Sequence, residues 1–303
     1  MSLKVACIGE AMVELSLAAS DPKHAKIGFA GDTLNTAIYL KRAAPALQVS
    51  YVTKLGRDSF SSQMLDFITA EDIDTDHVTY SDTRAVGLYA ITTDETGERS
   101  FAYWRGQSAA KQMFQMRDGI SFQVLEEFDV LFLSAITLAI LDPHVRDALI
   151  NWLPLYKQKT GGRVVFDSNY RPALWESQTQ AQDVIARMWR VTDIAVPSVD
   201  DEIDIFGDAN NDAVIDRLRG YGIRDGALKR GEDGPISLSD TPGTGPYPPA
   251  SKVVDTTAAG DSFNGGYLGA VLGGAPQPIA LCAGHDLAAK VVGVRGAIAP
   301  RNG

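Results

Sequence analysis

The sequence predicts an α/β fold in which helices cover both faces of a mostly parallel central sheet, and three observations lead to that class. From residue 128 onward, short apolar runs alternate with longer amphipathic stretches, the pattern of repeated strand–helix–strand units. Residues 87–93 and 99–105 alternate polar and apolar side chains around a polar turn, which predicts a β-hairpin in a separate small sheet. Polar clusters directly follow expected strand ends, where open parallel sheets bind their ligands.

The N-terminal part supplies the first strands and helices of this architecture. An apolar run stops at Gly9, which predicts a buried strand over residues 5–8. The imperfect alternation of residues 12–17 predicts a strand at the edge of the sheet, with Glu10 and Glu14 as exposed charges. The other elements expected before the hairpin are a strand-to-helix junction at 28–33, a helix over 34–41, a strand over 49–55 and a helix over 60–68.

The later part of the chain alternates more regularly between strand and helix. Three polar residues, Asp167, Asn169 and Arg171, follow one strand end and therefore point to a ligand site there. The elements expected here are strands over 129–134, 163–167, 193–196, 227–231, 235–238 and 252–254, helices over 143–157 and 181–189, a helix that follows 198–202, an irregular loop over 241–249, and a helix through 267–272.

Composition narrows the classes of partner and compartment. The 303 residues suffice for one large core, and the net charge of −10 argues against a nucleic-acid partner, since phosphate backbones recruit basic surfaces. Cys7 and Cys282 lie in apolar surroundings without metal-ligand spacing, so buried free thiols are expected. No signal pattern or bilayer-length apolar run is present, which predicts a cytoplasmic protein with no membrane partner.

One stretch, Asp255 to Phe263, carries the strongest chemical signal. The small residues Ala258, Ala259 and Gly260, which we call the anion turn, sit where the expected strand becomes a helix. Without bulky side chains, unpaired backbone N–H groups there can approach a phosphate closely, and the helix dipole favours the anion. Asp261 follows in the first helical turn. Helix capping alone explains one aspartate, but capping does not need two aspartates around such a turn.

This stretch resembles the signature of the ribokinase-like (PfkB) carbohydrate kinases, and similarity extends from Gly9 to Arg301. The other segments that carry it are residues 9–15, 31–36, 103–105 and 167–172. The resemblance implies a ribokinase-like three-layer α/β/α fold with a small β-sheet lid. It also implies that residues 1–303 form a single kinase domain, with the lid formed by insertions at about 10–30 and 86–108.

The resemblance implies transfer of the γ-phosphoryl group of ATP to a hydroxyl of 2-keto-3-deoxygluconate, giving the 6-phosphate and ADP. Asp261 is expected to accept the hydroxyl proton, with its pKa lowered by the helix N-terminus. The backbone N–H groups of Ala258, Ala259 and Gly260 would stabilise charge that develops on the phosphoryl oxygens. The cofactor implied is Mg²⁺, with K⁺ as a further candidate, and the lid implies a homodimer.

The resemblance also implies a role for individual residues. The sugar acid is expected at Gly31, Asp32, Asn35, Tyr89, Tyr103, Arg105, Ile136, Arg171 and Asp261. The nucleotide is expected at Asn169, Ser198, Lys229, Gly231, Gly234, Gly260 and His285. Asp201 is the candidate to hold Mg²⁺ through water, and Asp255 and Thr257 are the candidates for a monovalent cation. The chain departs from the family pattern at Ala30, where a glycine is usual, and at Ser198 and Asp201, which replace the Asn and Glu of Asn-x-x-Glu.

Two other functions remain open at this point. A kinase of the same family acting on a neutral sugar such as fructose is disfavoured by Arg105 and Arg171, because a neutral sugar needs no paired guanidinium groups. A nonenzymatic sugar-binding protein is disfavoured by Asp261 and the anion turn, which a pure binder does not need.

Overall fold

The computed structural model describes residues 2–18, 21–93 and 99–301. At its centre lies a five-stranded sheet in the order β13-β12-β11-β1-β4, in which every pairing is parallel. In β1, an inner strand of this sheet, Cys7 is paired with Phe132 on one side and with Tyr51 on the other. The strands are β1 (Lys4–Ile8), β4 (Gln48–Val52), β11 (Val130–Ser134), β12 (Arg163–Asp167) and β13 (Ile194–Ala195).

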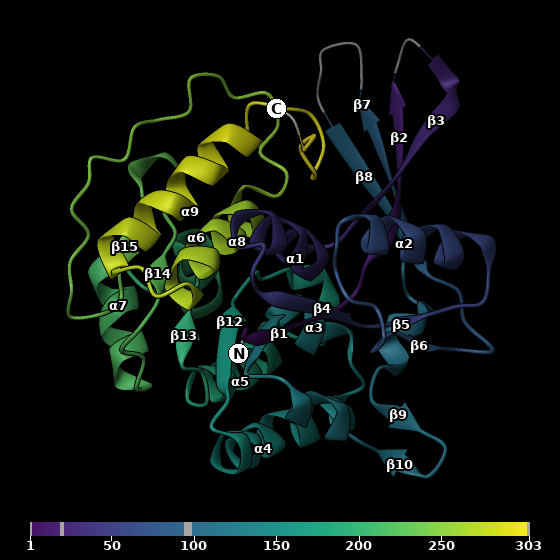
Figure 1. The fold of residues 1–303 in the computed structure, drawn as a ribbon, viewed down its shortest axis with the longest axis horizontal. Coiled ribbons are helices and arrows are strands. Elements are labelled where there is room, and N and C mark those ends of the chain that lie inside the picture. The colour runs from purple at the N-terminus through teal and green to yellow at the C-terminus, as the bar shows by residue number, and fades with distance from the viewer. Residues whose placement is uncertain (1, 19–20, 94–98, 302–303) are drawn as a thin grey trace.

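The strands are apolar on both faces, and successive side chains enter two different cores. In β1, Val5 and Cys7 belong to one core, and Ala6 and Ile8 belong to the other. Figure 1 shows helices on both sides of the sheet, so the predicted three-layer fold is confirmed. The first core is covered by α1 (Asp32–Ala43), α2 (Ser59–Ala70), α8 (Ala259–Leu272) and α9 (Gln277–Val291). The second is covered by α3 (Ala135–Ile140), α4 (Pro143–Thr160), α5 (Gln178–Trp189), α6 (Val199–Phe206) and α7 (Asn211–Gly220).

Local sequence signals fix where several of these helices begin and end. Asp58 caps α2 by accepting hydrogen bonds from the backbone N–H groups of Phe60 and Ser61. Helix α4 begins with a proline after Asp142 and ends at Gly161, whose φ of +72° is a left-handed conformation that glycine adopts without strain. These caps satisfy backbone groups that the helix itself leaves unpaired.

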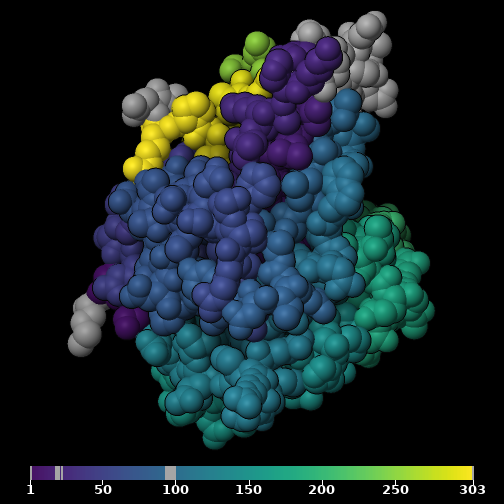
Figure 2. Space-filling view, turned by 90° about the vertical axis from the view of Figure 1, so that its right-hand side faces the viewer, coloured from purple at the N-terminus to yellow at the C-terminus, as the bar shows by residue number. Residues whose placement is uncertain are grey.

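A second sheet, the lid, projects from the body (Figures 1 and 2). Its order is β3-β2-β7-β8, from β2 (Met12–Ala18), β3 (Asp21–Ala30), β7 (Gly87–Thr93) and β8 (Arg99–Trp104). The predicted hairpin is confirmed as β7 and β8, in which Tyr89 lies opposite Tyr103, and its connection at 94–98 lies outside the described residues. The strand predicted at the edge of the main sheet is wrong in its place. It is β2, an inner strand of the lid, because it pairs with both β3 and β7.

Three other sequence expectations need correction. The strand expected over 252–254 is absent from the described structure: Val253 is 64% exposed, and Val254 N–H donates to Val292 O in the segment after α9. The strand over 49–55 splits after Val52, because β5 (Lys54–Leu55) leaves the main sheet to pair with β6 (Thr79–Tyr80). The strands over 227–231 and 235–238 shrink to β14 (Ala227–Leu228) and β15 (Ile236–Ser237), an antiparallel pair.

The remaining elements are small. The strands β9 (Gln115–Met116) and β10 (Gly119–Ile120) form an antiparallel pair. Both cysteines are free thiols, and Cys7 is buried as predicted, whereas Cys282 is only half-buried. Among the residues that the structure describes, none of the helices combines the length and the apolar character that crossing a bilayer requires.

A close approach of α1 and α8 sets the position of the first turn of α8. A Cβ at Gly265 would lie 2.4 Å from the Cβ of Tyr39 and 2.7 Å from the backbone nitrogen of Leu40. Both contacts are shorter than atoms tolerate, so only glycine lets the two helices meet at this distance.

We therefore expect Gly265→Ala to lower the free energy of unfolding by about 1–3 kcal/mol, the usual cost of overpacking. Urea denaturation followed by circular dichroism measures it. The matched control is Gly220→Ala in α7, where an added Cβ meets nothing within 4 Å. Equal stability of the two variants would contradict tight packing at Gly265.

Candidate active site

Three of the candidate sugar-binding residues, Gly31, Asp32 and Asn35, lie at the N-terminus of α1, beside the carboxyl ends of the central strands. A Cβ at Gly31 would lie 2.2 Å from the carbonyl oxygen of Glu10, so this turn also requires glycine. Asp32, in the first turn of α1, accepts hydrogen bonds from the Ser134 hydroxyl and, at 3.0 Å, from Asn169 Nδ2. Both donors follow or end strands of the sheet, so Asp32 is tied to β11 and to the segment after β12.

The candidate proton acceptor Asp261 is bonded directly to that helix. Ala258 precedes α8 in a left-handed conformation, with φ +60°, and Asp261 stands in the first helical turn. Asn35 Nδ2 donates to Asp261 Oδ2 at 2.8 Å, and the Thr36 hydroxyl donates to the Asp261 carbonyl at 3.3 Å. Residues from opposite ends of the chain therefore form one polar site at the α1–α8 contact.

Electrostatics in this site overturn the pKa expected for Asp261. The pKa of its carboxyl is raised to about 7, first by burial and then by the charge of Asp32. The hydrogen bond from Asn35 opposes that rise without cancelling it. Burial also raises the pKa of Asp32. Desolvation and neighbouring carboxylates thus outweigh the helix dipole, which alone would have lowered the pKa of Asp261.

A buried lysine lies beneath the anion turn. Lys229 Nζ donates to Asp167 Oδ2 at 2.7 Å and to Asn264 Oδ1 at 3.1 Å. Asn264 Nδ2 also donates to Asp167 Oδ2 at 2.6 Å, which closes a three-residue network. A Cβ at Gly260 would lie 3.5 Å from Lys229 Nζ, so the ammonium group borders the turn. Asn264 was not predicted, although its position three residues after Asp261 places both on one helix face.

The lid contributes an aromatic wall and a buried ion pair. The rings of Tyr89 and Tyr103 stack with centroids 5.8 Å apart, and the Tyr89 hydroxyl donates to Glu14. Arg105, one residue beyond β8, donates from Nη2 to Glu10 Oε2. Glu10 is 2% exposed, so the interpretation of Glu10 as an exposed charge is wrong. Glu14 is half-buried, so the same interpretation fails there too.

Five of the candidate nucleotide residues, Ser198, Lys229, Gly231, Gly234 and His285, lie around the short loop after β14. Ser198, just before α6, pairs with Lys229 through an isolated parallel β-bridge. Gly234 has a φ of +73°. The Tyr247 ring covers Gly234, where a Cβ would lie 2.4 Å from Tyr247 Cδ2. His285 of α9 packs against the same ring, with centroids 5.3 Å apart, and its Nε2 lies 2.7 Å from Pro248 O. Tyr247 is a neighbour of this region that sequence reasoning missed, because the 241–249 loop carries no periodic signal.

The other predicted residues come from separate elements. Ile136 lies half-buried in α3, two residues after Ser134. Gly231 begins a short 3₁₀ turn after β14. Arg171 is 54% exposed at its side chain, and its guanidinium lies 3.7 Å from Asp201. Burial and the charge of Asp167 raise the pKa of Asp201 to about 6.

The resemblance implies Mg²⁺ and K⁺, which would bind at acidic residues of the site. Within the described ranges, no three or more His, Cys, Asp or Glu side chains are grouped to hold a metal. Mg²⁺ in kinases is commonly held by one or two carboxylates together with substrate phosphates, and Asp201 fits that arrangement. Asp255 accepts hydrogen bonds from Thr257 N–H at 3.0 Å and from Gly296 N–H at 2.7 Å. These two bonds join the segment before α8 to the segment after α9.

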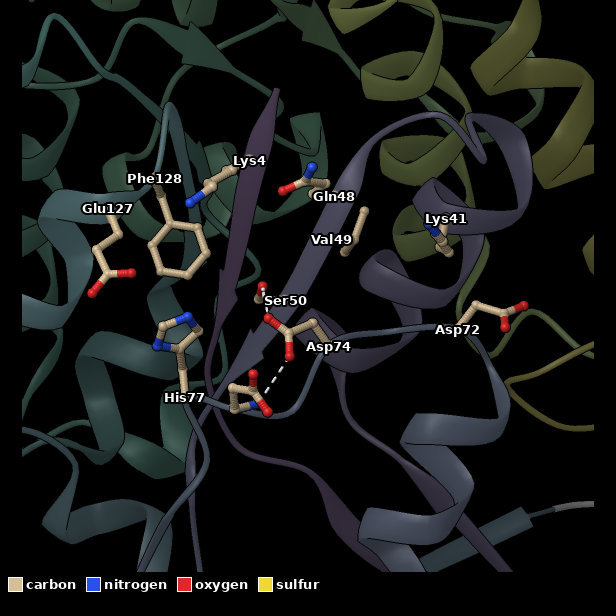
Figure 3. A pocket seen from close by; sticks show the side chains of 11 residues that line it. Lys4, Lys41, Gln48, Val49, Ser50, Asp72, Asp74, His77, Glu127 and Phe128 are labelled. Atoms are coloured by element: carbon tan, nitrogen blue, oxygen red, sulfur yellow. Dashed lines mark hydrogen bonds between the residues drawn. The ribbon is translucent and has the colours of Figure 1, made fainter. Parts of the chain in front are cut away.

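A cavity of about 480 Å³ lies elsewhere, near the amino ends of β1 and β4 (Figure 3). Lys4, Gln48, Asp74 and His77 are among its lining residues, and Asp74 accepts a hydrogen bond from Ser50 at 2.8 Å. The predicted ligand residues follow the opposite, carboxyl ends of the parallel strands. This cavity is therefore separate from the candidate active site.

Known proteins resemble this chain in sequence and in fold. Residues 2–302 match the sequence pattern described as "pfkB family carbohydrate kinase". The chain is 44% identical over 310 residues to the 2-dehydro-3-deoxygluconokinase of Escherichia coli strain K12, covering 99% of this chain and 98% of that protein. The crystal structure of 2-dehydro-3-deoxygluconokinase from Thermotoga maritima superimposes with a TM-score of 0.82 at 19% identity, covering 98% and 96% of the two chains. A putative ribokinase II from E. coli, in complex with ATP and Mg²⁺, gives 0.80 at 20% identity, covering 98% and 94%.

The raised pKa of Asp261 predicts a pH-dependent stability of the ligand-free protein. The pKa of Asp261 is about 7 in the folded protein, above the ordinary value of 3.8. The neutral carboxyl therefore contributes fully to the free energy of unfolding below about pH 4, and that contribution is lost as the pH rises to 7. Asp261→Asn avoids that loss. We expect the advantage of the variant over wild type to grow by about 1 kcal/mol per pH unit across that window and to stay constant above it.

Chemical denaturation from pH 5 to pH 8.5 measures this difference. A gap between the two proteins that does not change with pH would show that Asp261 is ionised throughout and that burial does not control it.

Proposed function

The chain belongs to the pfkB family of carbohydrate kinases, and we propose that it phosphorylates 2-dehydro-3-deoxygluconate, also called 2-keto-3-deoxygluconate. The reaction transfers the γ-phosphoryl group of ATP to the terminal hydroxyl, giving the 6-phosphate and ADP. The contact between Asn35 and Asp261 carries the proposal, because it joins the candidate sugar-binding helix to the candidate base at 2.8 Å. Identity of 44% over nearly the whole of a named 2-dehydro-3-deoxygluconokinase supports the substrate.

In this proposal Asp261 accepts the proton of the attacking hydroxyl. A pKa of about 7 suits that role better than an ordinary aspartate pKa, because a general base works best with a pKa near the working pH. Asn35 orients the carboxyl, and Asp32 holds sugar hydroxyls from the other side. Phosphoryl transfer is loose, so the proton can leave late in the reaction.

The start of α8 and Lys229 are proposed to stabilise the negative charge of the transferred phosphoryl group. The first N–H groups of a helix lack partners within it. In the anion turn the Ala259 N–H donates to Thr256 O at 3.2 Å, so the N–H groups of Ala258 and Gly260 are the ones proposed to bind the phosphoryl oxygens. Lys229, fixed by Asp167 and Asn264, adds a buried positive charge beside Gly260. Asp201 is the residue proposed to hold Mg²⁺ through water, and the ion, when bound with the nucleotide, would supply positive charge against the phosphates.

The lid and the loop after β12 are proposed to determine substrate specificity. Arg105 with Tyr89 and Tyr103 would approach the carboxylate from the lid, and Arg171 would approach it from the body. A guanidinium suits a carboxylate through paired hydrogen bonds. One observation keeps a neutral-sugar kinase as the second candidate: both arginines already have carboxylate neighbours, Glu10 and Asp201.

The finer assignments belong to the same proposal. Gly31 and Ile136 would contact the sugar acid, and Asn169, Ser198, Gly231, Gly234 and His285 would contact ATP. K⁺ would bind at Asp255 and Thr257. The exposed apolar side chains of the lid, Ile27, Phe101 and Trp104, support a homodimer formed through that sheet. A single kinase domain working in the cytoplasm completes the proposal.

Asp261→Asn tests the proposed base. Loss of a general base costs about 10²–10⁴-fold in kcat, and ATP affinity should change little because the variant keeps the shape of the side chain. A coupled assay of ADP release gives kcat, and calorimetry gives the Kd for ATP. Turnover at the wild-type rate would reduce Asp261 to a structural residue of α8.

Substrate charge tests the proposed specificity. The neutral analogue 3-deoxyfructose carries CH₂OH in place of the carboxylate, and charge-assisted hydrogen bonds are worth roughly 1.5–3 kcal/mol each. We expect wild-type kcat/KM for the acid to exceed that for the analogue by about a hundredfold or more. Arg171→Leu should remove most of that preference and leave the KM for ATP unchanged.

The matched control is Arg57→Leu, which removes an exposed guanidinium that pairs with Asp82 on the surface. It should leave the preference intact. Equal use of acid and analogue by the wild-type enzyme would favour the neutral-sugar candidate.

A further inference from the structure

The ion pair between Glu10 and Arg105 lies at the junction of lid and body. Glu10 follows β1 and belongs to the body, whereas Arg105 follows β8 at the base of the lid. The Arg105 side chain is 11% exposed and the Glu10 side chain is fully buried. A buried pair of this kind rarely adds net stability over apolar residues, so its retention needs another reason.

Glycines on both sides show how closely this pair is fitted. A Cβ at Gly87, the first residue of β7, would lie 2.8 Å from Glu10 Oε1 and 3.3 Å from the Cβ of Arg105. On the body side, the carbonyl oxygen of Glu10 packs against Gly31, the residue before α1. Glu10 therefore touches the candidate sugar-binding turn through its backbone and the lid through its side chain.

The pair is incomplete within the described part of the chain. Arg105 Nε and Glu10 Oε1 are both buried without a hydrogen-bond partner there. A buried polar atom without a partner costs about 1–3 kcal/mol. One hydrogen bond, from Arg105 Nη2 to Glu10 Oε2, joins the two side chains. Nε lies on the same edge of the guanidinium as Nη2, so the donors left for an acceptor from outside the pair are those of Nη1.

We propose that Glu10 is a positioning residue for substrate selection: it holds Arg105 so that the free edge of the guanidinium meets the carboxylate of the sugar acid. This inference rests on the proposed function and adds a residue that the family signature does not single out. A guanidinium has five N–H donors in a fixed fork, so one edge can stay on Glu10 while another binds substrate. With Glu10 in place, the guanidinium of Arg105 is held in one orientation before substrate binds, which lowers the cost of ordering it on binding.

Glu10→Gln tests the proposal, because it keeps the shape of the side chain and removes its charge. We expect kcat/KM for 2-dehydro-3-deoxygluconate to fall by about tenfold or more, mainly through KM, as a charge-assisted hydrogen bond is lost. For 3-deoxyfructose, kcat/KM should change less than about twofold, because this sugar has no carboxylate to accept a hydrogen bond from Arg105. Glu10→Asp, which keeps the charge, should recover part of the loss.

The matched control is Glu71→Gln. Glu71 is also a buried glutamate paired with an arginine, Arg42 at 2.7 Å, but it lies between α2 and the segment that follows. This variant should lower the melting temperature and leave the ratio of acid to neutral kcat/KM unchanged. In an Arg105→Leu background, Glu10→Gln should no longer alter that ratio, since the residue it positions is gone.

The outcomes separate this inference from the proposed function. If the wild-type enzyme shows equal kcat/KM for 2-dehydro-3-deoxygluconate and 3-deoxyfructose, the proposed substrate is wrong. The inference about Glu10 is then wrong as well, because it rests on that substrate. A wild-type preference that Glu10→Gln leaves unchanged overturns the inference alone and makes Glu10 purely structural. A preference that rises in Glu10→Gln also overturns it, because Glu10 would then compete with the substrate for Arg105.

Discussion

The crowding of carboxylates around the start of α8 is the constraint on which the site depends. Asp261, Asp32 and Asp167 influence one another electrostatically, and the ammonium group of Lys229 lies beside Asp167. Amide and hydroxyl donors from Asn35, Asn169 and Ser134 supply the remaining compensation. Because neutral donors stabilise a carboxylate less than a cation does, Asp261 keeps a raised pKa in the ligand-free protein. A base of this strength results from burial, which the rest of the fold has to maintain.

Helix packing maintains that burial. The close contact of α1 and α8 at Gly265 brings Asn35 to Asp261, and Tyr39 of the same helix donates its hydroxyl to Ala297 O beyond α9. Helix α8 and the segment after α9 are thereby both fixed against α1. A displacement of about 1 Å between the helices would separate the base from the amide that orients it, and such displacements are costly in catalysis.

Much of this arrangement could be predicted from the sequence, and the failures share a cause. Apolar runs and small residues are local signals, so the strands from residue 128 onward and the turn before Asp261 were recognisable. The pKa of Asp261 was predicted in the wrong direction, because the prediction used its own helix and not Asp32, which lies far away in sequence. Glu10 was interpreted as exposed because its partner, Arg105, is 95 residues away. The valines at 253 and 254 look like a strand, but no neighbouring strand pairs with them among the described residues.

The same long-range contacts explain why the site is a property of the whole chain. Asn35 and Asp261 are separated by 226 residues, and Lys229 and Asp167 by 62. None of these side chains has its working partner within its own strand–helix unit, and closing such long loops costs entropy before any bond forms. Intermediate structures that contain only the central sheet would therefore carry the strands but no buried base. The carboxylates become crowded, and Asp261 acquires its raised pKa, only when α1 and α8 come together.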